Sequence, residues 1–142
     1  MNKIIDCITF FNENFIFDLR YQIIKDYVTN LIICESEYDH RGKPKKLNFN
    51  YKKYQNDKKI IYIVHQKSFK DKNPWVNQAT QREFILENIS FADDEDYIFF
   101  SDPDEIPNTE ILKNFKLNKK YGIFFQKSFN YKFNLFNEFE TP

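Results

Sequence analysis

The chain has little glycine, little cysteine and no net charge. Of its 142 residues, 2 are Gly and 2 are Cys, and 21 Lys+Arg residues balance 21 Asp+Glu residues. A net charge of zero removes the broad electrostatic attraction that draws a protein to nucleic acid or to an anionic membrane. We therefore expect no nucleic-acid partner. The length suits one domain with a core of ordinary size.

The two cysteines do not form the pattern of a zinc site. Cys7 and Cys34 each lie inside an apolar run, and no C-x-x-C pair occurs. A structural zinc site therefore has no support. A disulfide or a reactive pair is one interpretation, and two buried thiols that pack like small hydrophobic side chains are the favoured one.

The sequence also lacks membrane and export signals. It has no apolar stretch of about 18 residues and no signal-type start with a cleavage site. We expect a cytoplasmic chain without a transmembrane segment.

Short apolar runs alternate with helical patterns along the chain. The runs predict strands at 3–11, 30–36, 60–65, 97–101 and 121–126. Helices are expected at about 13–28 (apolar spacing Phe17, Arg20/Tyr21, Ile24, Val28), at about 77–90 (Ala79, Ile85, Leu86, Ile89 near one face), and from Pro107 and Asn108 to about Phe115. The Lys-rich stretch 37–59 predicts a long loop. Because the strands are continuously apolar, we expect an α/β fold with a mostly parallel sheet covered on both faces.

An acidic cluster follows the fourth apolar run, in the sequence YIFFSDPDEIP at 97–107. Asp102 and Asp104 flank Pro103, and Glu105 follows directly. A solvated turn is one interpretation. Three neighbouring carboxylates repel one another unless a cation or hydrogen-bond donors offset the charge. Hard oxygen ligands suit Mg²⁺ or Mn²⁺, so a divalent metal site at Asp102 and Asp104 is the favoured interpretation.

Other D-x-D chemistries fit this cluster less well. A calcium-binding EF-hand loop requires a third oxygen ligand and then a glycine, where this chain has Ile106 and Pro107. A phosphatase with a nucleophilic Asp carries its motif after the first strand, with Thr or Val at the fifth position, so that interpretation is weakened. A nucleotide-sugar transferase fits better, since there a D-x-D at a strand end holds the metal that bridges the donor diphosphate.

Four segments together resemble glycosyltransferase family 17, which includes the β-1,4-mannosyl-glycoprotein β-1,4-N-acetylglucosaminyltransferases. They are FFNENFIFDLR at 10–20, ICESEYDHRGKPK at 33–45, NPWVNQATQREFI at 73–85 and the SDPDEIP block. The resemblance spans nearly the whole chain. It implies a GT-A-like nucleotide-sugar-binding fold, a UDP-linked donor (UDP-N-acetylglucosamine in known cases), a divalent metal, a glycan acceptor and inversion at the anomeric carbon.

The resemblance also implies site residues. By position, Asp102 and Asp104 are the metal-binding pair. The other matching positions are Asn12, Glu13, Asp18, Arg20, Glu35, Gly42, Arg82, Glu105 and Pro107. The chain departs from the family in having about half the usual length, without the downstream part where acceptor contacts lie, and without the membrane anchor of the animal enzymes. We therefore expect 1–142 to be a single donor-binding domain, incomplete at its C-terminus.

Four residues are candidates for binding the donor. Arg82 is suited to bind a phosphate in a bidentate way, although a surface ion pair with Glu83 or Glu87 explains it equally well. Glu13 and Glu35 end the first two strands, where a ribose or uracil would lie, or they are solvated loop acids. Asn12, one of the positions that match the family, is also assigned to the donor.

The remaining candidates concern catalysis and the basic loop. Glu105 and Asp104 are the candidate catalytic carboxylates, with Glu105 as base or additional metal ligand. Glu105 is equally explained as a helix N-terminal acid favoured by the helix dipole. Lys43 or Lys45 would attract donor phosphates, and a run of solvated lysines is the simpler explanation.

Two functions of different classes follow. The first is a metal-dependent inverting glycosyltransferase. The alternative is a non-catalytic nucleotide-sugar-binding or glycan-binding module left by truncation of such an enzyme, and a phosphatase is a distant third.

Overall fold

A computed structural model describes residues 2–129 and 136–137 of the chain. The chain divides into two compact units, Met1–Ile106 and Pro107–Pro142, and each is described by itself. The first unit contains, in order, β1 (Ile4–Phe10), α1 (Asn14–Ile24), β2 (Asn30–Ser36), the 3-10 turn η1 (Tyr51–Lys53), β3 (Ile60–His65), α2 (Pro74–Glu87) and β4 (Tyr97–Ser101). No helix in the described ranges is both long and apolar enough to cross a membrane.

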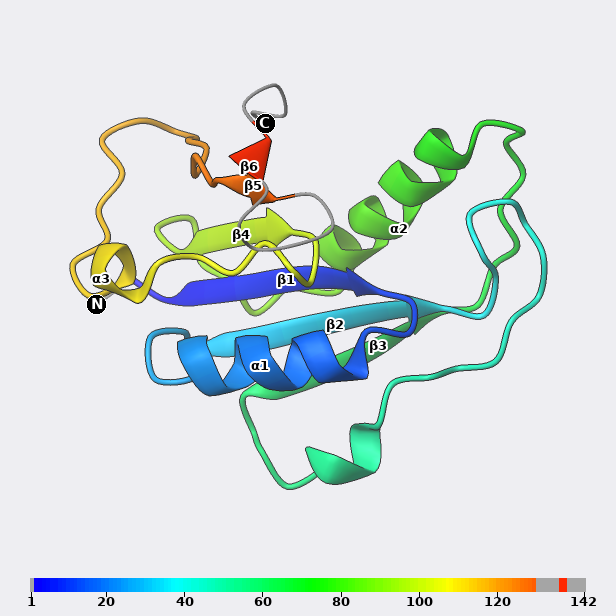
Figure 1. Cartoon of the computed structure of the whole chain (residues 1–142), viewed down its shortest axis with the longest axis horizontal. Coiled ribbons are helices and arrows are strands. Elements are labelled where there is room, and N and C mark those ends of the chain that lie inside the picture. Colours follow the sequence, from blue (N-terminus) through cyan, green and yellow to red (C-terminus); the bar gives the residue numbers. More distant parts are fainter. Residues whose placement is uncertain (1, 130–135, 138–142) are drawn as a thin grey trace. The chain divides into compact units, whose positions relative to one another are not determined.

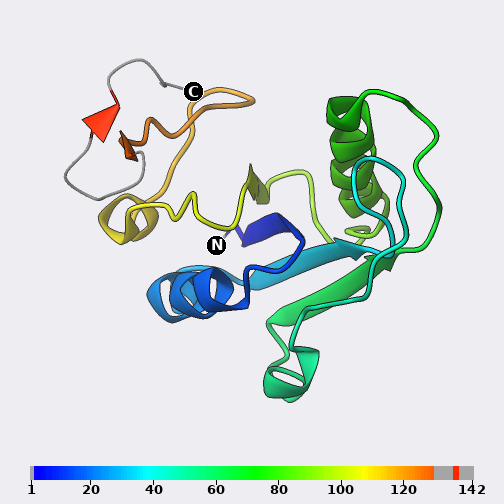
Figure 2. The ribbon, with the colours of Figure 1, turned by 45° about the vertical axis from the view of Figure 1, so that its right-hand side comes forward.

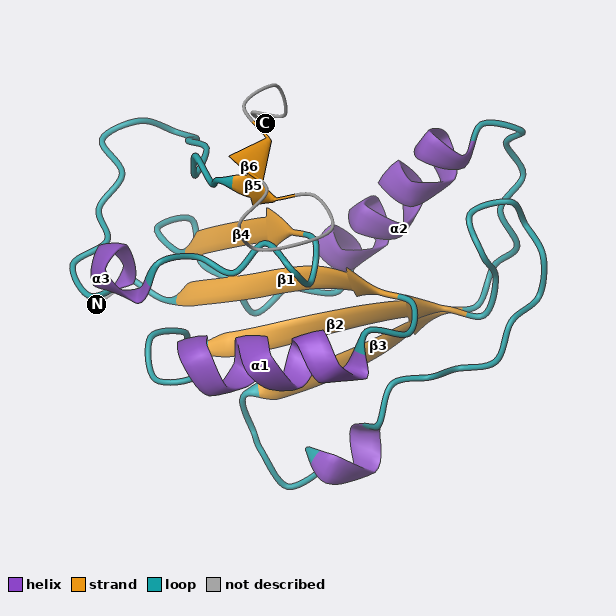
Figure 3. Ribbon diagram, viewed as in Figure 1, coloured by secondary structure: helices purple, strands orange, loops and turns teal. Residues whose placement is uncertain are grey.

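The four strands form one all-parallel sheet in the order β3-β2-β1-β4 (Figures 1 and 3). This confirms the predicted α/β class, and the four predicted strands of this unit lie where the sequence indicates them. The chain builds the sheet in one direction from β1 to β3, then returns so that β4 pairs on the other side of β1. The reversal creates a switch point between β1 and β4, and ligands of such sheets bind at the carboxyl ends of the strands there.

Helices cover opposite faces of this sheet, as Figure 2 shows for α1 and α2. On one face the odd-numbered residues Ile5 and Cys7 of β1 pack with Ile32 and Cys34 of β2 against Ile85 of α2. Both cysteines are buried free thiols. The prediction that they pack as small hydrophobic side chains is confirmed.

An aromatic cluster fills the other face, under α1. The ring of Phe17 makes edge contacts with Phe49 and Tyr54 at centroid distances of 5.0 and 5.2 Å. Phe10 at the end of β1 contacts Phe49 at 5.2 Å. The predicted coverage of both faces is therefore confirmed, and residues of the Lys-rich segment supply half of this cluster.

Both long helices differ from their predicted limits. Helix α2 begins three residues early because Asn73 caps it, its Oδ1 accepting a hydrogen bond from the Trp75 N–H at 3.0 Å, and because Pro74 fits the first helical position. Helix α1 ends at Ile24, and Val28 is buried beyond its end.

The predicted apolar face of α2 is partly wrong. Leu86 and Ala79 are exposed, whereas the buried positions within the helix are Asn77, Gln81 and Ile85. Two of these three are amides, so hydrophobic periodicity could not find this face. Their hydrogen bonds, described below, offset the cost of burying them.

The second unit contains α3 (Thr109–Leu112) and an antiparallel pair, β5 (Ser128–Phe129) and β6 (Phe136–Asn137). Asn108 caps α3 as its sequence predicts, accepting a hydrogen bond from the Glu110 N–H at 2.9 Å. The helix is shorter than predicted, ending three residues before Phe115.

The strand predicted at 121–126 is wrong, because this segment has no regular structure. Tyr121, Ile123 and Phe125 are largely exposed. An apolar run forms a strand only when a neighbour accepts its backbone hydrogen bonds, and pairing in the described part of this unit begins at Ser128. The aromatic stretch before Glu140 falls largely outside the described residues. The expected single, incomplete domain stays a prediction.

Candidate functional site

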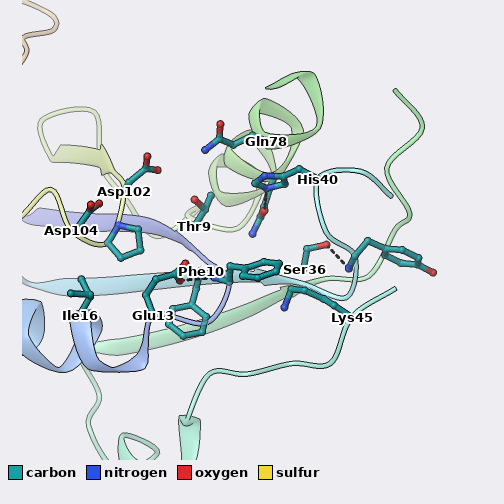
Figure 4. A pocket seen from close by; sticks show the side chains of 14 residues that line it. Thr9, Phe10, Glu13, Ile16, Ser36, His40, Lys45, Gln78, Asp102 and Asp104 are labelled. Atoms are coloured by element: carbon teal, nitrogen blue, oxygen red, sulfur yellow. Dashed lines mark hydrogen bonds between the residues drawn. The ribbon is translucent and has the colours of Figure 1, made fainter. Parts of the chain in front are cut away.

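A cleft of about 380 Å³ opens at the carboxyl ends of the parallel strands. Its walls come from β1 and the turn after it (Thr9, Phe10, Phe11), the start of α1 (Glu13, Ile16), the segment after β2 (Ser36, Tyr38, His40, Lys45), α2 (Gln78, Gln81) and the turn after β4 (Asp102, Pro103, Asp104). Figure 4 shows Asp102 and Asp104 on one side, His40 and Lys45 on the other, and Thr9 between them. The cleft therefore lies at the switch point between β1 and β4.

The turn that carries Asp102 and Asp104 is held by Arg20, a buried residue of α1. Its Nη1 donates to the carbonyl oxygens of Asp102 at 3.1 Å and Glu105 at 3.0 Å. Its Nη2 donates to the Ser101 hydroxyl at 2.6 Å. One guanidinium thus binds both ends of the turn, which fixes where the acidic side chains emerge.

Arg20 is itself fixed by Asp6 of β1. Its Nε donates to Asp6 Oδ2 at 2.8 Å and its Nη2 to Asp6 Oδ1 at 2.6 Å. Both side chains are 1% exposed. Bidentate geometry and the carbonyl partners satisfy this buried pair, and removing one member would leave an uncompensated charge that costs about 3–5 kcal/mol.

Sequence reasoning missed this arrangement. Asp6 was not singled out, and Arg20 was only a position that matches the family. The available signal was a single acid inside the apolar run IIDCITF together with an arginine on the apolar spacing of the next helix. Charged residues at positions that should be buried indicate a pair.

Glu105 makes a hydrogen bond inside the same turn. Its Oε2 accepts a hydrogen bond from the Asp102 N–H at 2.8 Å. It does not line the cleft. The geometry therefore supports a positioning role for Glu105, and its predicted role as catalytic base stays a prediction.

Arg82 of α2 approaches the acidic pair directly. Its Nη2 lies 2.8 Å from Asp102 Oδ1, so its partner is neither Glu83 nor Glu87. The two side chains are 41% and 43% exposed. An ion pair with that exposure contributes at most about 1 kcal/mol, and Arg82 can exchange Asp102 for a phosphate at little cost.

The oxygen chemistry of Asp102 and Asp104 fits a magnesium-type ion. Across residues 2–129 and 136–137, no group of three or more His, Cys, Asp and Glu side chains is placed to hold a metal by itself. Two carboxylates suffice for Mg²⁺ or Mn²⁺ when phosphate oxygens and water complete the coordination. The two carboxylates therefore fit a metal whose remaining ligands come from outside the chain.

The donor-binding candidates at the end of β1 have different positions. Glu13 lines the cleft, and its Oε2 accepts hydrogen bonds from the N–H groups of Phe11 and Asn12 at 2.9 Å each. The Asn12 side chain is exposed and is not part of the cleft wall. Glu13 thus shapes the strand-to-helix turn, and the cleft brings it together with Asp102 and Asp104.

Glu35 is not brought into the cleft. It is fully buried, and Oε1 accepts from Lys45 Nζ at 2.6 Å and the Asn48 N–H at 2.7 Å. Oε2 accepts from the Phe49 N–H at 3.1 Å and the Tyr62 hydroxyl at 2.8 Å. Burial, and then the bond to Glu35, raises the pKa of Tyr62, which keeps this phenol a donor. Glu35 therefore organises the segment after β2.

Through Glu35, one lysine of the basic segment reaches the cleft. Lys45 lines the cleft wall, and its Nζ lies 5.2 Å from the centroid of the Phe11 ring. Lys43 is exposed and is not part of the wall. The polar wall residues Thr9, Tyr38, His40, Gln78 and Gln81 were not predicted, although Tyr38 and His40 follow the end of β2.

Comparison with known proteins agrees with the geometry. No curated protein and no solved structure matches the chain significantly. The sequence profile of one family, glycosyltransferase family 17, matches residues 1–139. That range contains every residue of the cleft. The chain therefore belongs to glycosyltransferase family 17, and its cleft is part of a glycosyltransferase domain.

Proposed function

We propose that the chain is a metal-dependent inverting glycosyltransferase that uses UDP-N-acetylglucosamine as donor and a glycan hydroxyl as acceptor. The observation that carries this proposal is the position of Asp102 and Asp104. Both line a cleft at the switch point of a parallel sheet. The Arg20 side chain holds their turn through hydrogen bonds to the turn's backbone carbonyls. Family membership supplies the reaction class, and the acidic turn supports a diphosphate donor.

In this proposal the donor diphosphate lies beside Asp102 and Asp104. A divalent cation held there would offset the negative charge that grows on the departing UDP. Arg82 would release its weak pair with Asp102 and donate to a phosphate oxygen. Arg20 and Glu105 would keep the turn in place from behind, and Glu13 would keep the end of β1 open beside it.

The test is a calorimetric titration of UDP-N-acetylglucosamine into the purified chain, with Mn²⁺ and then with EDTA. We expect binding that requires Mn²⁺ and that Asp102→Asn/Asp104→Asn abolishes. The matched control is Asp93→Asn/Asp94→Asn, two exposed acids outside the cleft, and we expect it to bind like the unmodified chain. Binding that EDTA does not change would refute the metal dependence. If the folded chain binds none of a panel of UDP- and GDP-sugars, the proposed donor site is refuted.

One observation favours the alternative, a module that binds a nucleotide sugar or glycan without turnover. The carboxylate of Glu105 accepts a backbone hydrogen bond inside the turn, and Glu105 does not line the cleft in which an acceptor would meet the donor. Incubation with donor and a panel of glycan acceptors separates the two functions. Metal-dependent donor binding without release of UDP would favour the module.

A further inference from the structure

His40 sits at the end of the cleft remote from Asp102 and Asp104 (Figure 4). It belongs to a tight hairpin after β2, closed by a bridge between Tyr38 and Pro44. Gly42 in this hairpin has φ of +79°, a conformation that favours glycine. Two backbone hydrogen bonds across the hairpin, from the Asp39 N–H to the Lys43 carbonyl and from the Lys45 N–H to the Glu37 carbonyl, complete it.

Two buried amides of α2 hold His40 at two points. Asn77 Nδ2 donates to the His40 carbonyl oxygen at 2.8 Å. Gln81, one helical turn further, has its Oε1 2.8 Å from His40 Nε2. Both amides are 2% exposed. These are the two polar residues on the buried face of α2, and both are used to place one side chain at the cleft.

The hydrogen bonds of Gln81 determine which nitrogen of His40 carries the proton. Gln81 Nε2 donates to the carbonyl oxygen of Cys34 at 2.7 Å, and a backbone carbonyl can only accept. The amide oxygen of Gln81 must therefore face His40, so His40 Nε2 must be the donor. In the neutral imidazole the proton is then on Nε2, and Nδ1 is an acceptor. No described residue donates a hydrogen bond to Nδ1.

We propose that His40 Nδ1 accepts a hydrogen bond from the nucleoside of the donor, from a ribose O–H or from the N3–H of uracil. This rests on the proposed function, which places the diphosphate at Asp102 and Asp104. The cleft runs from β4 across β1 to the segment after β2, and in nucleotide-binding parallel sheets the ribose is read at the end of the strand next to the phosphate site. Phe11, which is 51% exposed, adds an aromatic surface to the same cleft.

The tautomer can be measured without ligand. The chain has 2 histidines, so the ¹⁵N spectrum of the imidazole rings is simple, and His40→Phe assigns it. We expect the neutral imidazole of His40 to be in the Nε2–H form, and its Nδ1 resonance to shift when UDP and diamagnetic Mg²⁺ are added to the unmodified chain. An Nδ1–H form, or no shift at saturating UDP, would overturn the assignment.

Affinity for UDP gives the second measurement. We expect His40→Phe to weaken UDP binding about tenfold, whereas Arg41→Ala, an exposed residue of the same hairpin outside the cleft wall, leaves it unchanged. Titrations with 2′-deoxy-UDP, 3′-deoxy-UDP and 3-methyl-UDP identify the contacted group. The analogue that lacks it should bind weakly to the unmodified chain and lose nothing further in His40→Phe.

The outcomes separate this inference from the proposed function. If His40→Phe binds UDP normally while Asp102→Asn/Asp104→Asn does not, the donor site stands and the His40 assignment fails. If His40→Phe weakens UDP-N-acetylglucosamine but not UDP, the contact is with the transferred sugar and the nucleoside assignment fails. If the folded unmodified chain binds neither ligand, both proposals fail.

Discussion

At the scale of single residues, the site depends on charges that do not touch the cleft. Asp6 and Arg20 are buried, and Asp6 fixes the guanidinium of Arg20. Arg20 in turn donates hydrogen bonds to backbone carbonyls of the acidic turn. The acidic side chains that face the cleft are therefore placed by a pair on the opposite side of the turn. This separates the stability of the turn from its ligand chemistry, and two substitutions can test the separation.

Replacing Arg20 by Met should lower the free energy of unfolding by about 3–5 kcal/mol, because Asp6 stays buried without its partner. The double variant Asp6→Leu/Arg20→Met should be more stable than Arg20→Met alone, since a packed apolar pair removes the stranded charge. Urea denaturation measures both.

Neither variant should bind Mn²⁺ and UDP like the unmodified chain, because the carbonyls of the turn have lost their donor. A double variant that recovers both stability and binding would show that Arg20 acts only on the fold. Calorimetric titration of UDP with Mn²⁺ into the folded double variant decides this.

The two cysteines should be inert in the folded chain. Burial raises the pKa of Cys34 to about 12 and raises that of Cys7 as well, so almost no thiolate is present at neutral pH. Iodoacetamide followed by mass spectrometry should show modification of Cys7 and Cys34 only after unfolding in urea. Rapid alkylation of either thiol in the native chain would contradict the packing described for this face.

At the scale of elements, the segment between β2 and β3 is organised by one buried carboxylate. Glu35 accepts four hydrogen bonds, from Lys45, Asn48, Phe49 and Tyr62. Polar composition alone predicts a loop there, and it cannot show that an acid at the end of the preceding strand holds that loop against the sheet. The donor-binding assignment of Glu35 did not take this burial into account, and it stays a prediction.

Glu35→Gln should therefore lower stability by about 2–4 kcal/mol, because the partly buried Lys45 loses its counter-charge and one acceptor of the buried Glu35 becomes a donor. The matched control is Tyr62→Phe, which removes one of the four donors and should cost about 1 kcal/mol. Thermal and urea denaturation measure both. A Glu35→Gln chain of unchanged stability would contradict the structural role and favour the donor-binding one.

A helix or strand could be predicted from the sequence when apolar burial alone accounts for it. It was missed when it depends on specific hydrogen bonds to other parts of the chain. The four parallel strands were predicted because each is a short apolar run, and β1 and β2 at the centre of the sheet are buried almost throughout. The run 121–126 has the same composition, but no described strand pairs with it. The amide face of α2 was missed because Asn77 and Gln81 are buried by virtue of specific hydrogen bonds, which hydrophobic periodicity does not record.

At the scale of the whole molecule, stability should fall in acid. The hydrogen bond from Tyr21 lowers the pKa of Asp57, and the bonds from Lys53 and Tyr54 lower that of Asp18 against the opposing effect of burial. Carboxyls with a lower pKa in the folded chain add stability above their unfolded value of 3.8. That contribution is lost as the pH falls below this value toward the folded pKa.

Urea denaturation at a series of pH values from 7 to about 2.5 should show this loss. Asp57→Asn should be less stable than the unmodified chain at neutral pH and should show a smaller decrease in acid. A free energy of unfolding that stays constant, or rises, as the pH falls below 4 would contradict the two hydrogen bonds.

The location of the cleft follows from the topology of the whole sheet. The sequence pattern predicted parallel strands, and it placed Asp102 and Asp104 directly after one of them. It did not predict that β4 pairs beside β1, which brings the acidic turn next to Thr9 and Phe10. Strand order depends on pairing between segments far apart in the chain. It cannot be predicted from the composition of the individual strands, because these are similar.

The most direct test of the central claim is to locate bound Mn²⁺ by paramagnetic broadening of the backbone amide spectrum in the presence of UDP. The proposed site predicts the strongest broadening at 101–105 and at Thr9 and Phe10, reversal by EDTA, and loss in Asp102→Asn/Asp104→Asn. Broadening centred on the other acidic segment, 93–96, or spread evenly over the chain would show that the cleft does not hold the metal.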